Sequence, residues 1–275
     1  MPDEHDQSVL RFEHVTVAFD ELKALDDVSF DVPAGESLVL FGASGSGKTV
    51  LLKTALGLQK PDTGRVYVFG RDTTKLREQD LFRIRSHIGV LFQEGGLFDS
   101  LTIEENVSYP LANLEEFHCT PQEMHERAEE ALRFVELEHT LEKFPSELSG
   151  GMRRRVGIAR AVVTEPRLVL YDSPTAGLDP ITAYTIIALI LKERDLKNTT
   201  TVTATHRFQD GHFLATSRYN GKTGEIERLD GEDGESGLRT TFLVLREGRL
   251  AFQGTLAELK ESADPYVTKF VKRED

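Results

Sequence analysis

Residues 42–49 have the types and spacing of a phosphate-binding loop. They read GASGSGKT and fit the pattern GxxxxGK followed by Ser or Thr. The loop follows an apolar run at residues 37–41 and precedes a stretch with helical spacing, and this context makes the pattern specific. Glycines let consecutive backbone N–H groups point at phosphate oxygens, and the positive end of the following helix points at the same anion. The segment therefore predicts a nucleotide phosphate site.

The last two residues of this loop have separate predicted roles. Lys48 adds a point charge at the β- and γ-phosphates, and the hydroxyl of Thr49 coordinates Mg²⁺. The alternative is a glycine-rich turn without a ligand, which the flanking strand and helix disfavour. The other loop residues are expected to contact the phosphates: Gly42, Ala43, Ser44, Gly45, Ser46 and Gly47.

A carboxylate ends a second apolar run, at residues 168–171. Asp172 comes directly after this run, where it would face the Mg²⁺ held beside Thr49. A cap on a helix or turn is the alternative role, which the upstream loop makes the weaker one. The next residue is Ser173, and a serine hydroxyl does not act as a base near neutral pH.

Short apolar runs alternate along the chain with helical patterns. The runs lack the polar alternation of half-exposed strands, so they predict buried strands of a parallel sheet covered on both faces. Strand–helix alternation of this kind indicates an α/β fold. The predicted strands lie at residues 37–41, 88–92, 168–171 and 199–205.

Three stretches have helical periodicity, and two of them start with clear capping residues. Thr120 is the predicted N-cap of the second helix, Pro121 its first residue and Glu123 the partner in a capping box. Asp179 is the predicted N-cap of the third helix. The helices are expected at residues 48–58, 121–137 and 180–196.

Two segments depart from the α/β pattern. Residues 95–165 look mostly helical and predict an inserted helical subdomain within an α/β core formed by residues 1–94 and 166–275. Residues 210–240 are rich in glycine and acidic residues, and Asn220 followed by glycine is a hairpin-turn sequence. This insertion is therefore either a surface hairpin or a partly disordered loop.

Composition argues against several classes of protein. The 275 residues include 46 acidic and 33 basic side chains, a net charge of −13, which disfavours a nucleic-acid binder with a basic face. The one cysteine, Cys119, permits no internal disulfide and suits a reducing compartment. The opening residues MPDEHDQSV have no signal-peptide pattern, and no apolar run approaches the roughly 20 residues of a membrane helix. We expect a soluble chain that reaches a membrane only through a partner.

Further motifs follow the phosphate loop in a fixed order. They are LFQEGG with Gln93, LSGGM at residues 148–152, LVLYD ending in Asp172, AGLD ending in Asp179 and TATH ending in His206. With these motifs the chain resembles the nucleotide-binding subunits of ABC transporters over nearly its whole length, residues 210–240 excepted. The resemblance implies a P-loop NTPase fold with a RecA-like parallel-sheet core, an N-terminal antiparallel β portion and an inserted helical subdomain.

The resemblance also implies a head-to-tail dimer of two ATP-binding subunits, identical or different. Each ATP would lie between the phosphate loop of one subunit and the LSGG turn of the other. There Ser149, Gly150 and Gly151 would offer a hydroxyl and N–H donors to the γ-phosphate. Asp179 would communicate across the dimer, and capping the next helix is compatible with that role.

Three further residues take their roles from the resemblance. Phe19 matches the aromatic position that stacks on adenine, and the alternative is an ordinary strand aromatic. Gln93 would sense Mg²⁺ and the attacking water and would link the site to a transmembrane permease. His206 would contact the γ-phosphate.

One segment narrows the resemblance to a subfamily. Residues 95–111, GGLFDSLTIEENVSYPL, and LSGGM in place of LSGGQ are similar to the ATPases of Mce/Mla-type lipid transporters. This implies a permease, an MCE-type lipid-binding protein, a lipid or other hydrophobic cargo, and a cytoplasmic location on the inner face of the cell membrane. The alternative is that the segment only packs the helical subdomain through Leu97, Phe98, Leu101 and Val107, and both can hold.

The chain departs from the family at Ser173, where the usual residue is a glutamate that assists the attacking water. General-base assistance is worth about 10² to 10⁴ in rate, whereas phosphoryl transfer depends mostly on positioning and electrostatics. Three hypotheses follow: slow hydrolysis with water held by Ser173, Gln93 and His206; a different partner ATPase with a consensus site; or dimer closure on ATP binding alone. We expect a transport ATPase with modified or slowed chemistry. A soluble ABC protein of translation or DNA repair, and a non-hydrolysing scaffold, are the alternatives.

Four arginines make the helix after LSGG basic. We expect them to form a solvated helix face, with a contribution to positive potential at the ATP interface as the second interpretation. They are Arg153, Arg154, Arg155 and Arg160.

Overall fold

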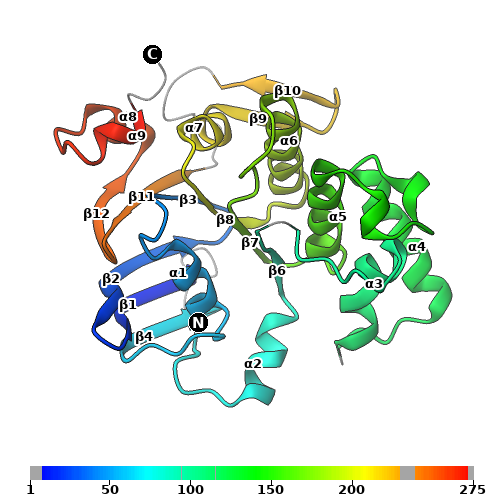
Figure 1. Cartoon of the computed structure of the whole chain (residues 1–275), viewed down its shortest axis with the longest axis horizontal. Helices are drawn as coiled ribbons and strands as arrows, with labels where there is room; N and C mark the ends of the chain where they lie inside the picture. The colour runs from blue at the N-terminus through cyan, green and yellow to red at the C-terminus, as the bar shows by residue number, and fades with distance from the viewer. Residues whose placement is uncertain (1–7, 94, 115, 230–238, 272–275) are drawn as a thin grey trace.

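The computed structural model describes residues 8–93, 95–114, 116–229 and 239–271. Figure 1 shows a central sheet flanked by helices, a second sheet on the N-terminal side and a group of helices on the opposite side. The α/β core, the antiparallel β portion and the helical segment that the resemblance implies are all present. The residue boundaries assigned to the domains stay a prediction.

The central sheet has six strands: β3 (Ser37–Gly42), β6 (Ile88–Leu91), β7 (Leu168–Asp172), β8 (Thr200–Thr205), β11 (Thr240–Arg246) and β12 (Arg249–Gly254). Their order is β12–β11–β3–β8–β7–β6, and all neighbours from β11 to β6 run parallel. Every residue of β3, β7 and β8 is buried, which explains why these strands show no polar alternation in the sequence. The four predicted strands are confirmed to within one residue at each end.

Both faces of the sheet carry a hydrophobic cluster, as β3 illustrates. Val39 and Phe41 enter one cluster, and Leu38 and Leu40 enter the other. Alternate residues of a strand point to opposite faces, so one short run supplies both clusters.

The second sheet is antiparallel and has the order β2–β1–β4–β5, formed by β1 (Ser8–Phe19), β2 (Leu22–Pro33), β4 (Thr63–Val68) and β5 (Arg71–Asp72). Helix α1 (Lys48–Ala55) follows β3 and contacts strands of both sheets. It ends three residues before the predicted Leu58. Gly57 has a φ of +65°, and the N–H groups of Gly57 and Leu58 bond back to carbonyls of the last helical turn.

The helical segment consists of α3 (Ile103–Asn113), α4 (Pro121–Phe134) and α5 (Gly150–Val162), with two short 3₁₀ turns between α4 and α5. Helix α2 (Glu78–Arg85) precedes β6. The capping box of Thr120 and Glu123 is confirmed. The predicted end of α4 at Leu137 is wrong, because Glu136 takes a φ of +61° and leaves the helical path.

Helix α6 (Pro180–Lys197) follows β7 and begins at the predicted N-cap, Asp179. It ends at Asn198, whose φ of +52° is the left-handed conformation common after a helix. The remaining helices are α7 (Phe208–Thr216), α8 (Leu256–Glu261) and α9 (Thr268–Val271).

The predicted insertion at residues 210–240 is partly a helix, because its first residues belong to α7. A hairpin of β9 (Ser217–Asn220) and β10 (Glu225–Arg228) follows, with the side-chain oxygen of Asn220 accepting turn N–H groups. Asp195 of α6 accepts from the N–H of Tyr219 at 2.6 Å, so the hairpin is docked on that helix. The acidic stretch DGEDGESG lies outside the described residues.

Candidate nucleotide site

The candidate residues lie together at the carboxyl ends of the parallel strands of the central sheet. The register pairs Leu91 with Tyr171, Asp172 with Ala204 and Phe41 with Thr205, so the carboxyl ends of β6, β7, β8 and β3 are adjacent. Open parallel sheets bind ligands at the carboxyl ends of their strands. The residues placed there are Gly42, Gln93, Asp172 and His206.

The phosphate loop folds around the ammonium group of Lys48. Its Nζ donates to the carbonyl of Gly42 at 2.8 Å and to that of Ala43 at 2.9 Å. The side chain is buried, and this burial lowers the pKa of Lys48 while the charge of Asp172 opposes the shift. A buried cation whose hydrogen bonds go to neutral carbonyls is a strong binding group for an anion.

Two glycines are required for the loop to close. A Cβ on Gly42 would lie 2.2 Å from the hydroxyl of Ser46, and one on Gly47 would lie 2.3 Å from the carbonyl oxygen of Ala24. Gly47 also has a φ of +109°, which a larger residue rarely adopts. The hydroxyl of Ser46 is buried and, within the described residues, has no hydrogen-bond partner. An unpaired buried donor in this loop fits a phosphate oxygen as its partner.

Thr49 and Asp172 meet, although they are far apart in the sequence. The hydroxyl of Thr49 donates to Oδ2 of Asp172 at 2.8 Å, and the hydroxyl of Ser173 donates to Oδ1 at 3.1 Å. Hydroxyl and carboxylate oxygens are the ligands that Mg²⁺ prefers. The residues present therefore fit the predicted metal, and the metal roles of Thr49, Asp172 and Gln93 stay predictions.

Ser173 has an unusual backbone conformation, with a φ of +51°. Such a conformation costs a non-glycine residue about 1–3 kcal/mol and needs support from its surroundings. The N–H of Ser173 donates to Ala204 at 2.8 Å, and its carbonyl accepts from Arg154 at 2.9 Å and from Ala176 at 3.1 Å. These bonds hold the backbone of Ser173, and its hydroxyl is held beside Asp172 by its own bond to Oδ1.

Arg154 is a residue whose position the sequence interpretation missed. We expected a solvated arginine face, which is wrong for Arg154, because only 4% of it is exposed. Its guanidinium donates to the carbonyls of Ser173 and Ala176. Arg160 is also partly buried and donates to the carbonyl of Gly95 at 3.0 Å. Helical periodicity could have placed Arg154 on a packed face, but no motif marks it.

His206 is exposed at the end of β8, and the residues around it are held by a buried carboxylate. Asp210 accepts from the hydroxyl of Thr205 at 2.9 Å and from that of Thr175 at 2.5 Å. Arg207 lies 3.7 Å from the other carboxylate oxygen. Burial raises the pKa of Asp210 and the two threonine bonds oppose the rise. Asp210 thus connects the His206 loop with the turn after Ser173, a link that sequence spacing did not suggest.

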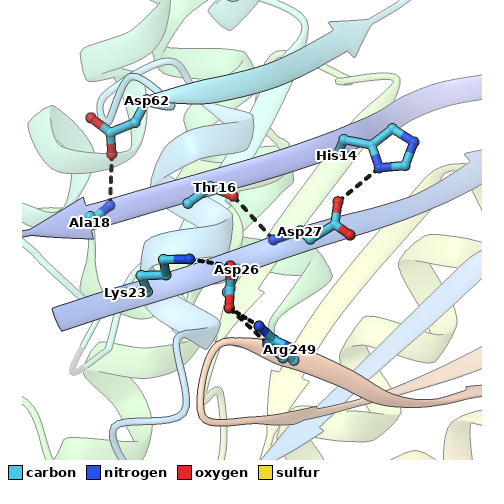
Figure 2. Close-up of polar contacts among 8 residues, drawn as sticks. All are labelled: His14, Thr16, Ala18, Lys23, Asp26, Asp27, Asp62 and Arg249. Carbon is cyan, nitrogen blue, oxygen red and sulfur yellow. Dashed lines mark hydrogen bonds and ion pairs between the residues drawn. The ribbon is translucent and has the colours of Figure 1, made fainter.

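Phe19 ends β1, pairs with Leu22 across the hairpin and is 47% exposed. The exposed ring leaves room for a base to stack on it, and the stacking on adenine stays a prediction. The neighbouring N–H of Ala18 donates to Asp62 at 2.7 Å, which holds the end of β1 (Figure 2).

The hairpin that carries Phe19 is tied to the phosphate loop through Asp26. Figure 2 shows Asp26 of β2 between Lys23 and Arg249, at 2.9 and 2.7 Å. Hydrogen bonds from Lys23 and then Arg249 lower the pKa of Asp26. The N–H of Asp26 donates to the carbonyl of Gly248, whose own N–H donates to the carbonyl of Ser46 at 3.2 Å. The hairpin that carries Phe19 and the loop of residues 42–49 are therefore positioned together.

The LSGG turn opens α5, as predicted. The hydroxyl of Ser149 accepts from the N–H of Met152 at 3.2 Å, so its proton is available to another acceptor. Nothing lies within 4 Å of a Cβ built on Gly150, whereas one on Gly151 would lie 2.5 Å from Cγ2 of Thr182. Figure 1 shows α5 and α1 well apart, so the structure does not bring this turn to the phosphate loop of the same chain.

Asp179 caps α6 by accepting from the N–H groups of Ile181 and Thr182 at 3.1 and 3.0 Å. The bond with the Thr182 side chain and then the backbone bonds lower the pKa of Asp179. The capping role is confirmed, and the role across a dimer stays a prediction. None of the helices in the described part of the chain combines the length and apolar character that a membrane crossing demands.

The sequence matches known ATP-binding proteins. The family model described as ABC transporter matches residues 25–176. The probable ribonucleotide transport ATP-binding protein mkl of Mycobacterium leprae is 38% identical over 192 residues, which are 70% of this chain and 55% of that protein. The methionine import ATP-binding protein MetN of Pasteurella multocida is 37% identical over 206 residues, 73% of this chain and 59% of that protein. The chain spans a little more than half the length of these relatives.

Solved cassettes have the same fold. The dimeric post-hydrolysis structure of the ATP-binding cassette MJ0796 with ADP and Pi has a TM-score of 0.75 and 31% identity, covering 90% of this chain and 98% of that one. The structure of cbiO1 from Clostridium perfringens, part of the ABC transporter complex cbiONQ, has a TM-score of 0.75 and 25% identity, covering 97% and 95%. The family match covers more than half of the 275 residues, and the chain therefore belongs to the ABC transporter family as an ATP-binding protein.

Proposed function

We propose that this chain is the ATP-binding subunit of a membrane ABC transporter, which closes as a dimer on ATP and Mg²⁺ and hydrolyses ATP slowly. The observation that carries the proposal is the contact of Thr49 with Asp172 at 2.8 Å, beside an intact phosphate loop. A nucleotide needs both the metal ligands and the phosphate cradle in one place, and this contact joins them.

The chain's own groups account for binding. Lys48 exchanges its two carbonyl partners for the β- and γ-phosphates, and the unpaired hydroxyl of Ser46 gains an acceptor. Mg²⁺, when bound, neutralises phosphate charge between Thr49 and Asp172. Phe19 stacks on adenine. Each of these interactions forms when ATP binds, before hydrolysis, and none of them involves Ser173.

Hydrolysis depends on how the attacking water is held. The proton of Ser173 is directed at Asp172, so its oxygen offers a lone pair that orients water and removes no proton. Gln93 follows β6 and His206 follows β8, the two strands beside β7, and in this proposal they supply the remaining contacts to the water and the γ-phosphate. The rate lost with the usual glutamate is about 10² to 10⁴.

Two observations favour a dimer with the LSGG turn of one subunit on the nucleotide of the other. Ser149–Gly151 lie away from the phosphate loop of their own chain, and Gly150 faces open space. The related cassette MJ0796 has been solved as a dimer with ADP and Pi. A dimer of two different ATPases remains the alternative in which the second chain supplies a consensus site.

A groove beside α2 suits a permease. It has a volume of about 690 Å³ and is lined by Glu78, Gln79, Phe82, Arg83, Ser86, Leu114 and Glu116. Phe82 is 43% exposed, and on α3 and the loop before it the rings of Phe98 and Tyr109 pack at 4.7 Å while both stay exposed. Exposed aromatic side chains are typical anchors of protein interfaces. Docking here would hold the chain on the cytoplasmic face of the membrane.

The cargo is proposed from residues 95–111, whose resemblance to Mce/Mla-type ATPases implies a lipid and an MCE-type partner. Val107 is fully buried and packs the helical segment, whereas Phe98 and Tyr109 are exposed, so the segment serves packing and a surface at once. Relatives are named for ribonucleotide transport and for methionine import, which are the competing cargo classes.

Isolation of the tagged full chain from solubilised membranes tests the assignment. Recovery of an integral permease with the wild-type chain, and its loss with Phe82→Glu, supports the assignment. Leu196→Glu is the control and should still recover the permease, because Leu196 is a similarly exposed apolar residue that lies on α6. Recovery of ribosomes or DNA-repair proteins instead would overturn the assignment. An MCE-type lipid-binding protein in the complex supports a lipid cargo, and a nucleotide- or amino-acid-binding protein in its place contradicts one.

A further inference from the structure

A buried arginine joins the helix of the LSGG turn to the turn that carries Ser173. Arg154 is the fifth residue of α5 and is 4% exposed. One end nitrogen donates to the carbonyl of Ser173 at 2.9 Å and the other to the carbonyl of Ala176 at 3.2 Å. Both of these acceptors belong to the backbone, so the guanidinium holds the path of the chain after β7.

A second contact links the same two parts. The start of α5 approaches α6 so closely that a Cβ on Gly151 would lie 2.5 Å from Thr182. The N–H of Thr182 is in turn held by Asp179 at 3.0 Å. With contacts at Arg154 and at Gly151, the first turns of α5 and residues 173–182 have little freedom to move independently.

The turn has internal bonds and a third support. Ala176 donates to the carbonyl of Ser173 at 3.1 Å, and Leu178 donates to that of Thr175 at 3.2 Å. The hydroxyl of Thr175 is held by Asp210, behind His206. Residues 173–182 are therefore expected to move as one unit, so that a displacement at one end also displaces the other end.

The joined parts face different nucleotides in the dimer, an argument that rests on the proposed function. Ser149–Gly151 would contact the ATP held by the second subunit. Ser173 would contact the water at the ATP of its own subunit. Arg154 thus directly connects the helix that faces one nucleotide with the turn that faces the other.

We propose that Arg154 is a positioning residue that couples the two nucleotide sites of the dimer. When the LSGG turn engages the γ-phosphate across the interface, α5 moves, and the guanidinium carries that movement to the backbone of Ser173. The hydroxyl of Ser173, which already lies beside Asp172, is thereby aligned with the attacking water. Coupling of this kind changes affinities or rates by about 5- to 150-fold.

The test uses the full chain in its purified transporter complex. Arg154→Gln keeps polar donors but loses the charged fork, and Arg154→Lys keeps the charge but reaches one carbonyl. Arg155→Gln is the matched control, because Arg155 lies next on the same helix and donates to a backbone carbonyl, that of Val135, at 3.0 Å. The Hill coefficient is measured for binding of a fluorescent ATP analogue and for phosphate release, together with the midpoint of thermal unfolding.

The coupling role predicts that Arg154→Gln lowers maximal turnover about tenfold and brings both Hill coefficients to about 1. The intrinsic ATP affinity of Arg154→Gln differs from that of the wild type by no more than about twofold. The turnover and Hill coefficients of Arg154→Lys lie between those of the wild type and Arg154→Gln. Arg155→Gln matches the wild type. In the double variant with Gly150→Ala, which disables the turn across the interface, Arg154→Gln adds no further loss.

Two results overturn the coupling. One is a wild-type Hill coefficient that Arg154→Gln leaves unchanged, including a value already near 1. The other is a loss in Arg154→Gln that equals the loss in Arg155→Gln and follows the unfolding midpoint. Failure of the proposed function looks different, because Lys48→Ala would then bind ATP as well as the wild type does.

Discussion

The hydroxyl of Ser173 donates a hydrogen bond to Oδ1 of Asp172 over 3.1 Å. The other oxygen of the same carboxylate accepts from Thr49, so both oxygens of Asp172 are engaged by hydroxyls. The serine proton points at the carboxylate, and its lone pairs are left for water. In the proposed ATPase this arrangement separates two steps, because the groups for binding ATP are complete while the step of proton removal has lost its usual base.

Substitutions of Asp172 and Thr49 test the metal ligands. Asp172→Asn removes the negative charge at constant shape, so the Mg²⁺ concentration for half-maximal ATP binding rises at least about tenfold. Thr49→Ser keeps the hydroxyl and stays close to the wild type, whereas Thr49→Val loses it. Titration with a fluorescent ATP analogue at varied Mg²⁺ measures this. An Asp172→Asn protein with wild-type Mg²⁺ dependence contradicts the assignment.

Gly150 and Gly151 are neighbours with opposite expected responses. Gly151→Ala forces a Cβ against Thr182 and destabilises the fold by about 1–3 kcal/mol, measured by chemical unfolding. Gly150→Ala places its Cβ in open space, so stability is unchanged. Its added methyl would lie where the nucleotide of the second subunit binds, so ATP-induced dimer closure is lost. The assignment of the LSGG turn fails if Gly150→Ala closes normally.

Phe19 tests the adenine side of the site. Phe19→Ala removes a stacking partner and weakens ATP binding by about 2- to 10-fold, while Phe19→Tyr retains it. Leu22→Ala is the control, because Leu22 is the cross-strand neighbour of Phe19 and is exposed. Binding of inorganic triphosphate, which has no base, stays the same in all three variants. Equal losses for ATP and triphosphate would show that Phe19 acts on the fold and not on adenine.

His125 gives the helical segment a pH dependence. Its Nδ1 lies 2.8 Å from Glu104, joining α4 to α3, and this hydrogen bond raises the pKa of His125. The folded state therefore binds the proton more tightly than the unfolded state does. The contribution to stability is complete below the unfolded pKa of about 6.5 and disappears as the pH rises through the raised folded value. The difference in unfolding free energy between wild type and His125→Gln should shrink over that window; a constant difference would exclude the ion pair.

The sequence predicted the structure best where a motif folds into one local backbone conformation. The phosphate loop, the strand ending at Asp172 and the caps at Thr120 and Asp179 all appear as predicted, because each depends on local backbone chemistry and burial. The helix ends at Ala55 and Phe134 were missed, since Gly57 and Glu136 leave the helix through positive φ angles that the apolar pattern does not reveal. Boundaries of this kind depend on single residues.

The supports behind the site were not predictable from local sequence. Arg154 and Asp210 are charged residues with no motif, and on their own segments they look like solvated side chains. Tertiary packing brings them to the backbone of Ser173 and to the hydroxyls of Thr175 and Thr205. Contacts across such separations follow from the arrangement of strands β7 and β8 and helix α5, which local sequence patterns do not determine.

Phosphate release from the purified transporter complex tests the central claim most directly. Wild type, Ser173→Glu, Ser173→Ala and Lys48→Ala are compared at saturating ATP and Mg²⁺. We predict slow turnover in the wild type and a gain of at least about tenfold in Ser173→Glu. Ser173→Ala should show a smaller change, which is a loss. Lys48→Ala should show no turnover above background. Wild-type turnover equal to that of a family member with the usual glutamate, with no gain in Ser173→Glu, would contradict the claim.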